Sequence, residues 1–137
     1  MTSPSIPRIR PLKGIRILSL ALNLPGPAEL MRCLEMGASC VKIESPAGDP
    51  MHSYCPTSYA SMHKGVRITS ADLKTDAGQK KLHRELVKAD VLLTSFRPSA
   101  LVKLGLTFKS LHKQYSQLSQ IAIVGSLARW LNRPDTT

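Results

Sequence analysis

The order of three short segments near the N-terminus constrains the fold of this chain more than any other feature. Ile15-Arg16-Ile17-Leu18-Ser19-Leu20 is β-branched and apolar, as expected of a buried strand. Gly26 and Pro27 precede a stretch with apolar residues at helical spacing, which Gly37 ends, and Cys40-Val41-Lys42-Ile43 follows as a second strand. Connections this short predict parallel pairing of the two strands through a right-handed crossover.

The same alternation continues along the chain. Val66-Arg67-Ile68-Thr69 and Val91-Leu92-Leu93 are strand-like, and residues 76–88 between them show one apolar and one charged helical face. Short helices are expected over 98–104 and 109–115, and a fifth strand over Ile121-Ala122-Ile123-Val124. This order predicts an α/β fold with a mostly parallel sheet and flanking helices.

Three stretches fall outside the alternation. Residues 1–11 hold three prolines and two arginines and are expected to form an extended lead-in, whereas residues 45–65 hold three prolines and two glycines and are expected to form a loop able to cover a ligand. The expected domain therefore covers 12–125, with a tail over 126–137. Because no helix is expected after the fifth strand, the sheet should leave apolar surface for a partner or for further chain.

Charge and composition limit the classes of partner. Residues 1–63 carry 6 basic and 4 acidic groups and residues 64–137 carry 13 and 5, so the second half holds +8 of the formal +10. Such a field favours nucleic acid, an acidic membrane surface or a phosphate-rich small ligand. The aromatic residues are scattered and do not alternate with basic clusters, which makes a nucleic-acid stacking platform a poor fit.

Cysteine, histidine and hydropathy patterns predict a reduced, cytoplasmic protein without a metal centre. Cys33, Cys40 and Cys55 are odd in number and form no Cys-x-x-Cys pair, and the four histidines show no metal-ligand spacing. No apolar run approaches a signal peptide or a membrane span in length.

The candidate ligand site lies where strands end and helices begin. Asn23-Leu24-Pro25-Gly26-Pro27 and Thr94-Ser95-Phe96-Arg97-Pro98 both occupy such positions, and ligands of open parallel sheets bind beyond the carboxyl ends of strands. The helix starts could offer N–H groups to a phosphate, Arg97 could bind phosphate in a bidentate manner, and Phe96 could face a flat ring. Further cations are available from Lys42, Lys74 and Lys103. The structural alternative places Phe96 in the core and Arg97 in solvent.

No catalytic machinery can be assigned from the residues. The chain lacks Gly-x-Gly-x-x-Gly, Walker-type and Gly-x-Ser-x-Gly motifs. Asp49, Asp72 and Asp90 occupy positions where turn preferences explain an aspartate. No catalytic residue is therefore proposed.

Several ordered motifs together resemble family III CoA-transferases. They are residues 12–18 (Leu-Lys-Gly-Ile-Arg-Ile-Leu), Pro25-Gly26-Pro27-Ala28, residues 36–50 (from Met-Gly-Ala to Gly-Asp-Pro), residues 72–78, residues 89–98 and Leu104-Gly105-Leu106. The resemblance covers about residues 11 to 125. It implies a Rossmann-like large domain, of which this chain would be an incomplete N-terminal portion, in an enzyme of two interlocked subunits.

The resemblance also implies a ligand and the residues that bind it. Coenzyme A, or acyl-CoA as substrate, would lie across the strand ends, with a carboxylic acid as acceptor in the intact homodimer. The implied CoA-binding residues are Asn23, Leu24, Pro25, Ala71, Asp72, Leu73, Lys74, Ser95, Phe96, Arg97, Lys103 and Leu104. In transferases of the family an aspartate attacks the thioester, and in its α-methylacyl-CoA racemases a histidine and an aspartate move the α-proton. Neither set matches a motif here, so the chain alone is expected to be inactive.

Two departures from the family pattern bear on the ligand. Ser45 stands where relatives often carry an arginine near the adenine, and Thr94-Ser95-Phe96-Arg97-Pro98-Ser99 replaces Glu-Asn-Phe-Arg-Pro-Gly. Leu24-Pro25 replaces the Gln-Ala of formyl-CoA transferases, which favours the racemase side. The alternatives are a basic nucleic-acid-binding α/β protein, or an interaction module that seats a separately encoded remainder of the enzyme.

Overall fold

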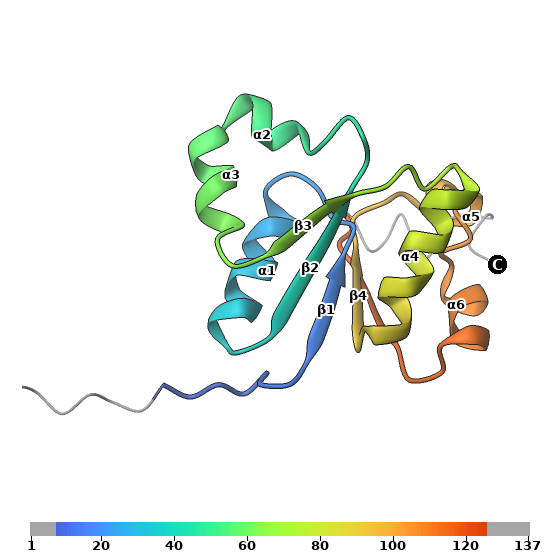
Figure 1. Ribbon diagram of the computed structural model, residues 1–137, viewed down its shortest axis with the longest axis horizontal. Helices are drawn as coiled ribbons and strands as arrows, with labels where there is room; N and C mark the ends of the chain where they lie inside the picture. Colours follow the sequence, from blue (N-terminus) through green and yellow to red (C-terminus); the bar gives the residue numbers. More distant parts are fainter. Residues whose placement is uncertain (1–7, 126–137) are drawn as a thin grey trace, which may run out of the picture.

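The computed structural model describes residues 8–125, which form a parallel sheet with helices on both faces (Figure 1). The strands are β1 (Arg16–Ser19), β2 (Ser39–Glu44), β3 (Arg67–Ser70), β4 (Val91–Thr94) and β5 (Ser119–Ala122). Their order in the sheet is β3-β2-β1-β4-β5, and every neighbouring pair is parallel. Because the chain leaves β1 for β2 on one side and later returns to β4 on the other, the order of the strands reverses at β1.

Two hydrophobic clusters lie on opposite faces of the sheet. Helix α4 (Asp76–Lys88), α5 (Pro98–Lys103) and α6 (Phe108–Gln114) cover the face that carries Leu18 and Leu92. Helix α1 (Pro25–Glu35) packs on the other face, against Ile17 and Leu93, and α3 (Pro56–Met62) contacts α1. Side chains alternate between these faces along each strand, which explains why both faces of the central strands are apolar.

The expected α/β architecture is confirmed, and most expected elements are present. Helix α4 has the expected bounds, and Gly37 lies just beyond α1 with a φ of 101°, a conformation that favours glycine. The fifth strand, however, begins two residues earlier than expected, at Ser119. Register explains the shift, since Ser119 and Gln120 pair with Val91 and Leu92 although neither is apolar.

The expected loop over residues 45–65 is instead largely helical. Helix α2 (Pro50–Tyr54) and α3 each begin with a proline at a first helical position, where its missing N–H is not needed. Helices of 5 and 7 residues are too short to show an amphipathic period, so the hydrophobic periodicity of the sequence does not reveal them.

The aspartates that were assigned to turns do have structural roles. Asp90 precedes β4, and its Oδ2 accepts a hydrogen bond from the Arg16 N–H at 2.8 Å, which ties the starts of β1 and β4. Asp72 Oδ1 accepts from the Lys74 N–H at 3.0 Å in the turn before α4. Of the expected lead-in over 1–11, residues 8–11 run along the amino end of the sheet, and residues 1–7, like the expected tail over 126–137, lie outside the described residues.

Candidate functional site

The turn between β1 and α1 is held by side chains from three different segments. The N–H of Ala21 donates to Ser19 Oγ at 3.1 Å, the N–H of Leu22 donates to Ser95 Oγ at 3.1 Å, and the N–H of Asn23 donates to Asp49 Oδ1 at 3.1 Å. Three consecutive N–H groups are therefore occupied within the protein. The bond from Leu22 to Ser95 also joins the two strand-to-helix turns that the sequence singled out.

Asn23 has an unusual backbone conformation. Its φ is 65°, and among residues 8–125 no other non-glycine residue has a positive φ. Asparagine tolerates the left-handed region better than most residues with a Cβ, and here its Oδ1 also accepts a bond from Tyr54 OH at 3.2 Å. Leu24 and Pro25, which follow it, are exposed at the carboxyl edge of the sheet.

The start of α1 offers few donors to a phosphate. Pro25 and Pro27 have no N–H, so Gly26 carries the single N–H of the first three helical residues. A Cβ on Gly26 would overlap Ala21, which shows how closely the helix start approaches the strand. The expected phosphate cradle of backbone N–H groups is therefore weak at this helix.

The remaining candidate residues lie on the α4 side of the same edge. Gln79 Nε2 donates to the carbonyl oxygens of Leu73 and Leu104, at 2.6 and 3.3 Å, and so joins the turn after β3 to the end of α5. Gly78 packs so closely against Asp72 that a Cβ would overlap the Asp72 carbonyl oxygen. These contacts fix the turn over 71–74 against the start of α4.

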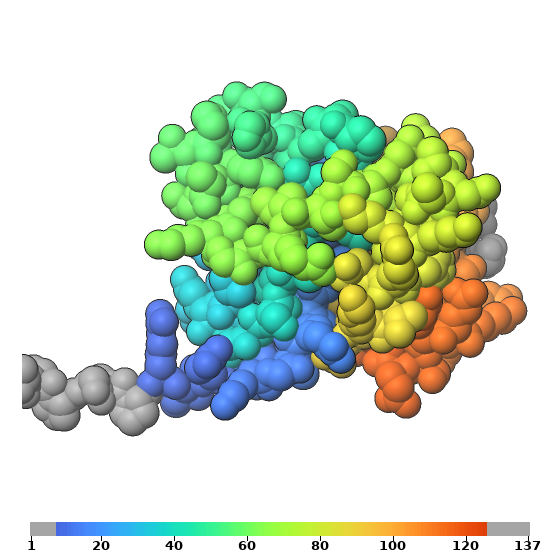
Figure 2. All heavy atoms as spheres, in the orientation of Figure 1, coloured from blue at the N-terminus to red at the C-terminus, as the bar shows by residue number. Residues whose placement is uncertain are grey.

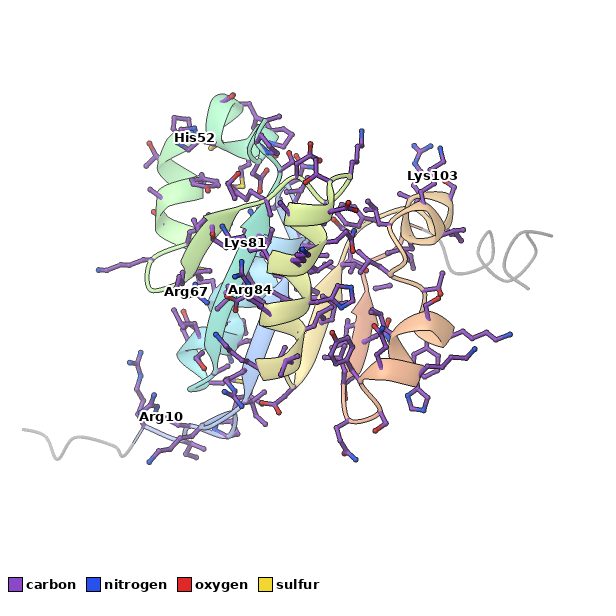
Figure 3. The ribbon with its side chains drawn as sticks, turned by 45° about the vertical axis from the view of Figure 1, so that its right-hand side comes forward. Arg10, His52, Arg67, Lys81, Arg84 and Lys103 are labelled. Carbon is purple, nitrogen blue, oxygen red and sulfur yellow. The ribbon has the colours of Figure 1, made fainter. Side chains whose placement is uncertain are left out.

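The candidate residues fall into two groups by exposure, since the cations are exposed and the apolar residues are half-buried or buried. Lys74, Arg97 and Lys103 are exposed, and Figure 3 shows Lys103 near the same end of the molecule as His52 and at the opposite end from Arg10. Leu73, Phe96 and Leu104 are half-buried and pack against the core cluster under α4, and Ala71 belongs to that cluster. Phe96 thus packs on the core while it remains partly accessible to solvent.

Lys42 is not available to a ligand, contrary to the expectation that it could add charge to a phosphate site. Its side chain is fully buried on the α1 face of β2. Nζ lies 2.6 Å from Asp49 Oδ2, 2.9 Å from Glu44 Oε2 and 3.0 Å from His63 Nε2. An ammonium has three protons, and these three acceptors account for all of them.

The contacts around His63 define its tautomer. Nε2 faces the Lys42 ammonium and must accept, so Nδ1 carries the proton that is donated to the Tyr59 carbonyl oxygen at 2.6 Å. Burial lowers the pKa of His63, and the neighbouring Lys42 charge acts in the same direction. For Asp49 burial alone would raise the pKa, but hydrogen bonds from Lys42, Met51 and Asn23 outweigh it and the pKa is lowered. Tyr59 OH completes the network by donating to Glu44 Oε2 at 2.9 Å.

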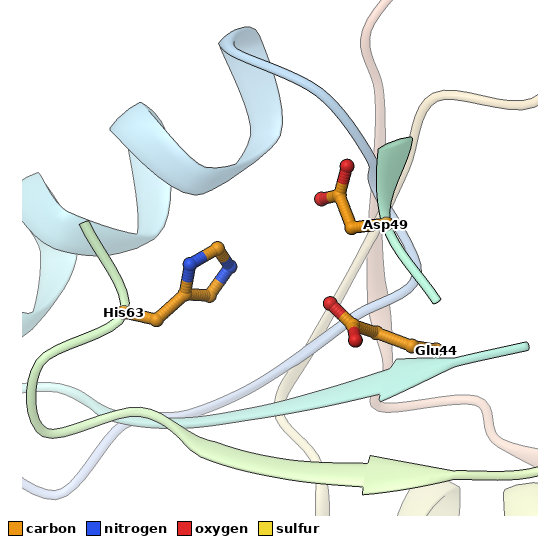
Figure 4. A group of neighbouring side chains, drawn as sticks. All are labelled: Glu44, Asp49 and His63. Carbon is orange, nitrogen blue, oxygen red and sulfur yellow. The ribbon is translucent and has the colours of Figure 1, made fainter. Parts of the chain in front are cut away.

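Glu44, Asp49 and His63 have the donor types of a metal site, and their histidine and carboxylate atoms converge within 4.8 Å of one another (Figure 4). Sequence spacing did not reveal this group, because its members come from the end of β2, the turn before α2 and the turn after α3. The centre of the group is the Lys42 ammonium, which contacts all three donors. In the folded chain the three side chains accept hydrogen bonds from the Lys42 ammonium, and a metal ion would have to displace that ammonium.

Comparison with known proteins identifies the chain's relatives. The family model described as CoA-transferase family III matches residues 12–126. The chain belongs to CoA-transferase family III. The expected resemblance is thus confirmed over the whole range in which the motifs lie.

Individual members of CoA-transferase family III show the same relation. The chain is 35% identical over 123 residues to the cinnamoyl-CoA:phenyllactate CoA-transferase of Clostridium sporogenes, covering 82% of this chain and 30% of that protein. It is 33% identical over 129 residues to the succinate–glutarate CoA-transferase of Agrobacterium fabrum, covering 84% and 32%. A crystal structure of a hypothetical protein from Mycobacterium tuberculosis superposes with a TM-score of 0.79 and 28% identity, covering 85% of this chain and 34% of that one. A structure described as a CAIB/BAIF family protein from Brucella suis gives 0.76 and 30%.

The chain therefore spans about a third of the length of these family members. Among residues 8–125 no helix is both long enough and apolar enough to cross a bilayer. The three cysteines are free thiols, and burial raises the pKa of Cys40 to about 11, which makes it a poor nucleophile at neutral pH.

Proposed function

We propose that this chain is the CoA-binding portion of a family III enzyme and that it binds coenzyme A, free or as a thioester, at the carboxyl edge of its sheet. The observation that carries the proposal is the convergence at that edge of four segments, the strand-to-helix turns after β1, β3 and β4 and the end of α5, joined in pairs. The Leu22 N–H donates a hydrogen bond to Ser95 Oγ. Gln79 Nε2 donates to the carbonyl oxygens of Leu73 and Leu104. The edge adjoins β1, where the strand order reverses, which is the usual ligand position in open α/β sheets.

The charges at this edge suit the ligand. Coenzyme A carries a pyrophosphate and a 3′-phosphate, and Lys74, Arg97 and Lys103 are exposed cations on three of the four segments. The CoA-binding set proposed for this edge is Asn23, Leu24, Pro25, Ala71, Asp72, Leu73, Lys74, Ser95, Phe96, Arg97, Lys103 and Leu104. Ala71 is buried, so its contribution would be through the backbone of the turn.

We propose that residues 1–137 alone bind CoA without transferring it, because no residue of the matched motifs supplies the attacking aspartate of the family's transferases. In the intact enzyme the partners would be an acyl-CoA and a carboxylic acid, in a homodimer in the cytoplasm. Whether that enzyme transfers CoA or racemises a 2-methylacyl-CoA is decided by assays of the full-length protein with both substrate types.

Calorimetric titration of the chain with CoA tests binding. We expect a saturable heat for the wild type and a Kd raised about tenfold in Arg97→Ala, the usual effect of losing one charge-assisted phosphate contact. Arg84→Ala is the matched control, since Arg84 is exposed on α4 away from the edge (Figure 3) and its loss should leave the Kd unchanged. No heat at millimolar CoA would contradict the proposal. Salt-sensitive binding of DNA or RNA that CoA does not displace would support the nucleic-acid alternative instead.

A further inference from the structure

The Asp49 carboxylate connects a buried cation to the exposed turn at Asn23. Both Asp49 oxygens lie within hydrogen-bonding distance of the Asn23 N–H, at 3.1 and 3.3 Å, and Oδ2 also contacts Lys42 Nζ. We infer that Asp49, fixed by Lys42, is a positioning residue that holds the Asn23 turn in the conformation that receives CoA. The inference rests on the proposed function for its ligand, although the turn geometry can be measured without one.

The conformation of Asn23 requires such a restraint. A φ of 65° is less favourable for a residue with a Cβ than for glycine. Two contacts oppose its relaxation, namely the N–H bond to Asp49 and the bond that Tyr54 OH donates to Asn23 Oδ1. If φ became negative, the chain direction would change at this residue, and Leu24 and Pro25 would be displaced from the edge.

The anchor is rigid because it lies inside the protein. Lys42 is fully buried, Asp49 is 2% exposed, and β2 lies between β1 and β3 in the sheet. Moving the carboxylate would break the Lys42 ion pair and would also release the Met51 N–H, which donates to Asp49 Oδ1 at 2.9 Å. The Asn23 turn is thereby fixed relative to the sheet, while the neighbouring Leu22 N–H is fixed to Ser95.

Asp49→Asn tests the inference, with Glu85→Gln as the matched control. The control makes the same carboxylate-to-amide change in a residue paired with Arg67 at 2.8 Å, on the opposite face of the sheet. We expect Asp49→Asn to raise the Kd for CoA about tenfold, because the binding-competent turn falls to about a tenth of the population. Glu85→Gln should change the Kd by less than about twofold.

An NMR measurement on the ligand-free chain separates positioning from helix capping. Asp49 accepts bonds from both the Asn23 and the Met51 N–H groups, so both amide protons should shift upfield in Asp49→Asn. If Asp49 only caps α2, the Met51 signal moves while the Asn23 signal and the Kd stay as in the wild type, which would overturn the inference. A wild type that does not bind CoA contradicts the proposed function, and the amide shifts still decide the positioning role.

Substitutions at Asn23 test the same idea if Asp49→Asn does not fold. Both variants lose every contact of the Asn23 side chain, but glycine adopts a positive φ freely and alanine does not, so Asn23→Gly should bind CoA at least about threefold more tightly than Asn23→Ala. Equal losses in the two variants would show that the Asn23 side chain, and not the turn conformation, is what matters, and would overturn the inference.

Discussion

Nζ of Lys42 lies 2.6 Å from Oδ2 of Asp49, and neither side chain is exposed to solvent. Ion pairs in such surroundings gain little net stability over apolar groups, yet removing one partner is costly because the other charge stays buried. The pair is therefore best understood as a device that fixes the position of the segment around Asp49, and with it the turn at Asn23. It joins β2 to the residue that precedes α2, and Figure 2 shows the segment of α2 and α3, drawn in green, at the top of the molecule.

Lys42→Met should destabilise the chain by about 3 to 5 kcal/mol, since Glu44 and Asp49 would keep buried charges without a cation. The double variant Lys42→Met/Asp49→Asn should recover at least half of that loss, because one of the two buried negative charges is also removed. Urea unfolding at neutral pH measures both values. Losses that simply add in the double variant would show that the two side chains do not interact.

Stability should fall as the pH is lowered from about 8 to about 5. Burial lowers the pKa of His63 below its ordinary value of 6.5, so in this range the unfolded chain binds a proton that the folded chain refuses. Asp49, whose pKa is lowered from 3.8, adds a further loss only below that value. Thermal unfolding should show a smaller loss of stability between about pH 8 and about pH 5 in His63→Gln than in the wild type. An identical pH profile in His63→Gln would contradict the assignment.

Zinc should stabilise Lys42→Ala and not the wild type. Removing the ammonium leaves Glu44, Asp49 and His63 with converging donor atoms, a combination that zinc accepts. We expect excess Zn²⁺ to raise the Tm of Lys42→Ala by several degrees relative to the metal-free protein, since ligands that bind the native state stabilise it. Lys42→Ala/His63→Ala is the control and should lose most of that rise. A comparable rise in the wild type would show that the ammonium does not exclude the metal.

Gly78→Ala should destabilise the chain by about 3 kcal/mol, because the new methyl group would overlap the Asp72 carbonyl oxygen at the start of α4. Gly105→Ala serves as the comparison, since that position has open space and costs only the strain of its φ of 69°, about 1 kcal/mol. Chemical denaturation measures the difference. Equal losses of unfolding free energy in the two variants would mean that the turn over 71–74 can move at little cost to make room for the methyl group.

The sequence predicted the fold class because apolar runs and helical periods alternate clearly in this chain. Helix α4 has both a Thr75 cap and a strong amphipathic pattern, so its bounds were accurate. Strand β5 was displaced by two residues, since Ser119 and Gln120 owe their strand conformation to pairing with β4. Sequence patterns carry no such information about pairing partners.

The buried charge network could not be predicted in the same way. Lysine is almost always exposed, so Lys42 was assigned to ligand binding, although its neighbours Val41 and Ile43 are apolar. Its position in a strand of a parallel sheet covered on both faces was the available signal, because a lysine there must find acceptors. The acceptors Asp49 and His63 lie in segments where short helices were not expected.

An amide chemical-shift map of the chain during titration with CoA tests most directly whether CoA binds at the carboxyl edge of the sheet. We expect progressive shifts at the carboxyl edge, in the turns that contain Leu24, Leu73 and Phe96, with unchanged signals from Arg16, Ser39 and Ser119 at the amino edge. Saturating shifts confined to the amino edge, or no shifts at millimolar CoA, would contradict this expectation.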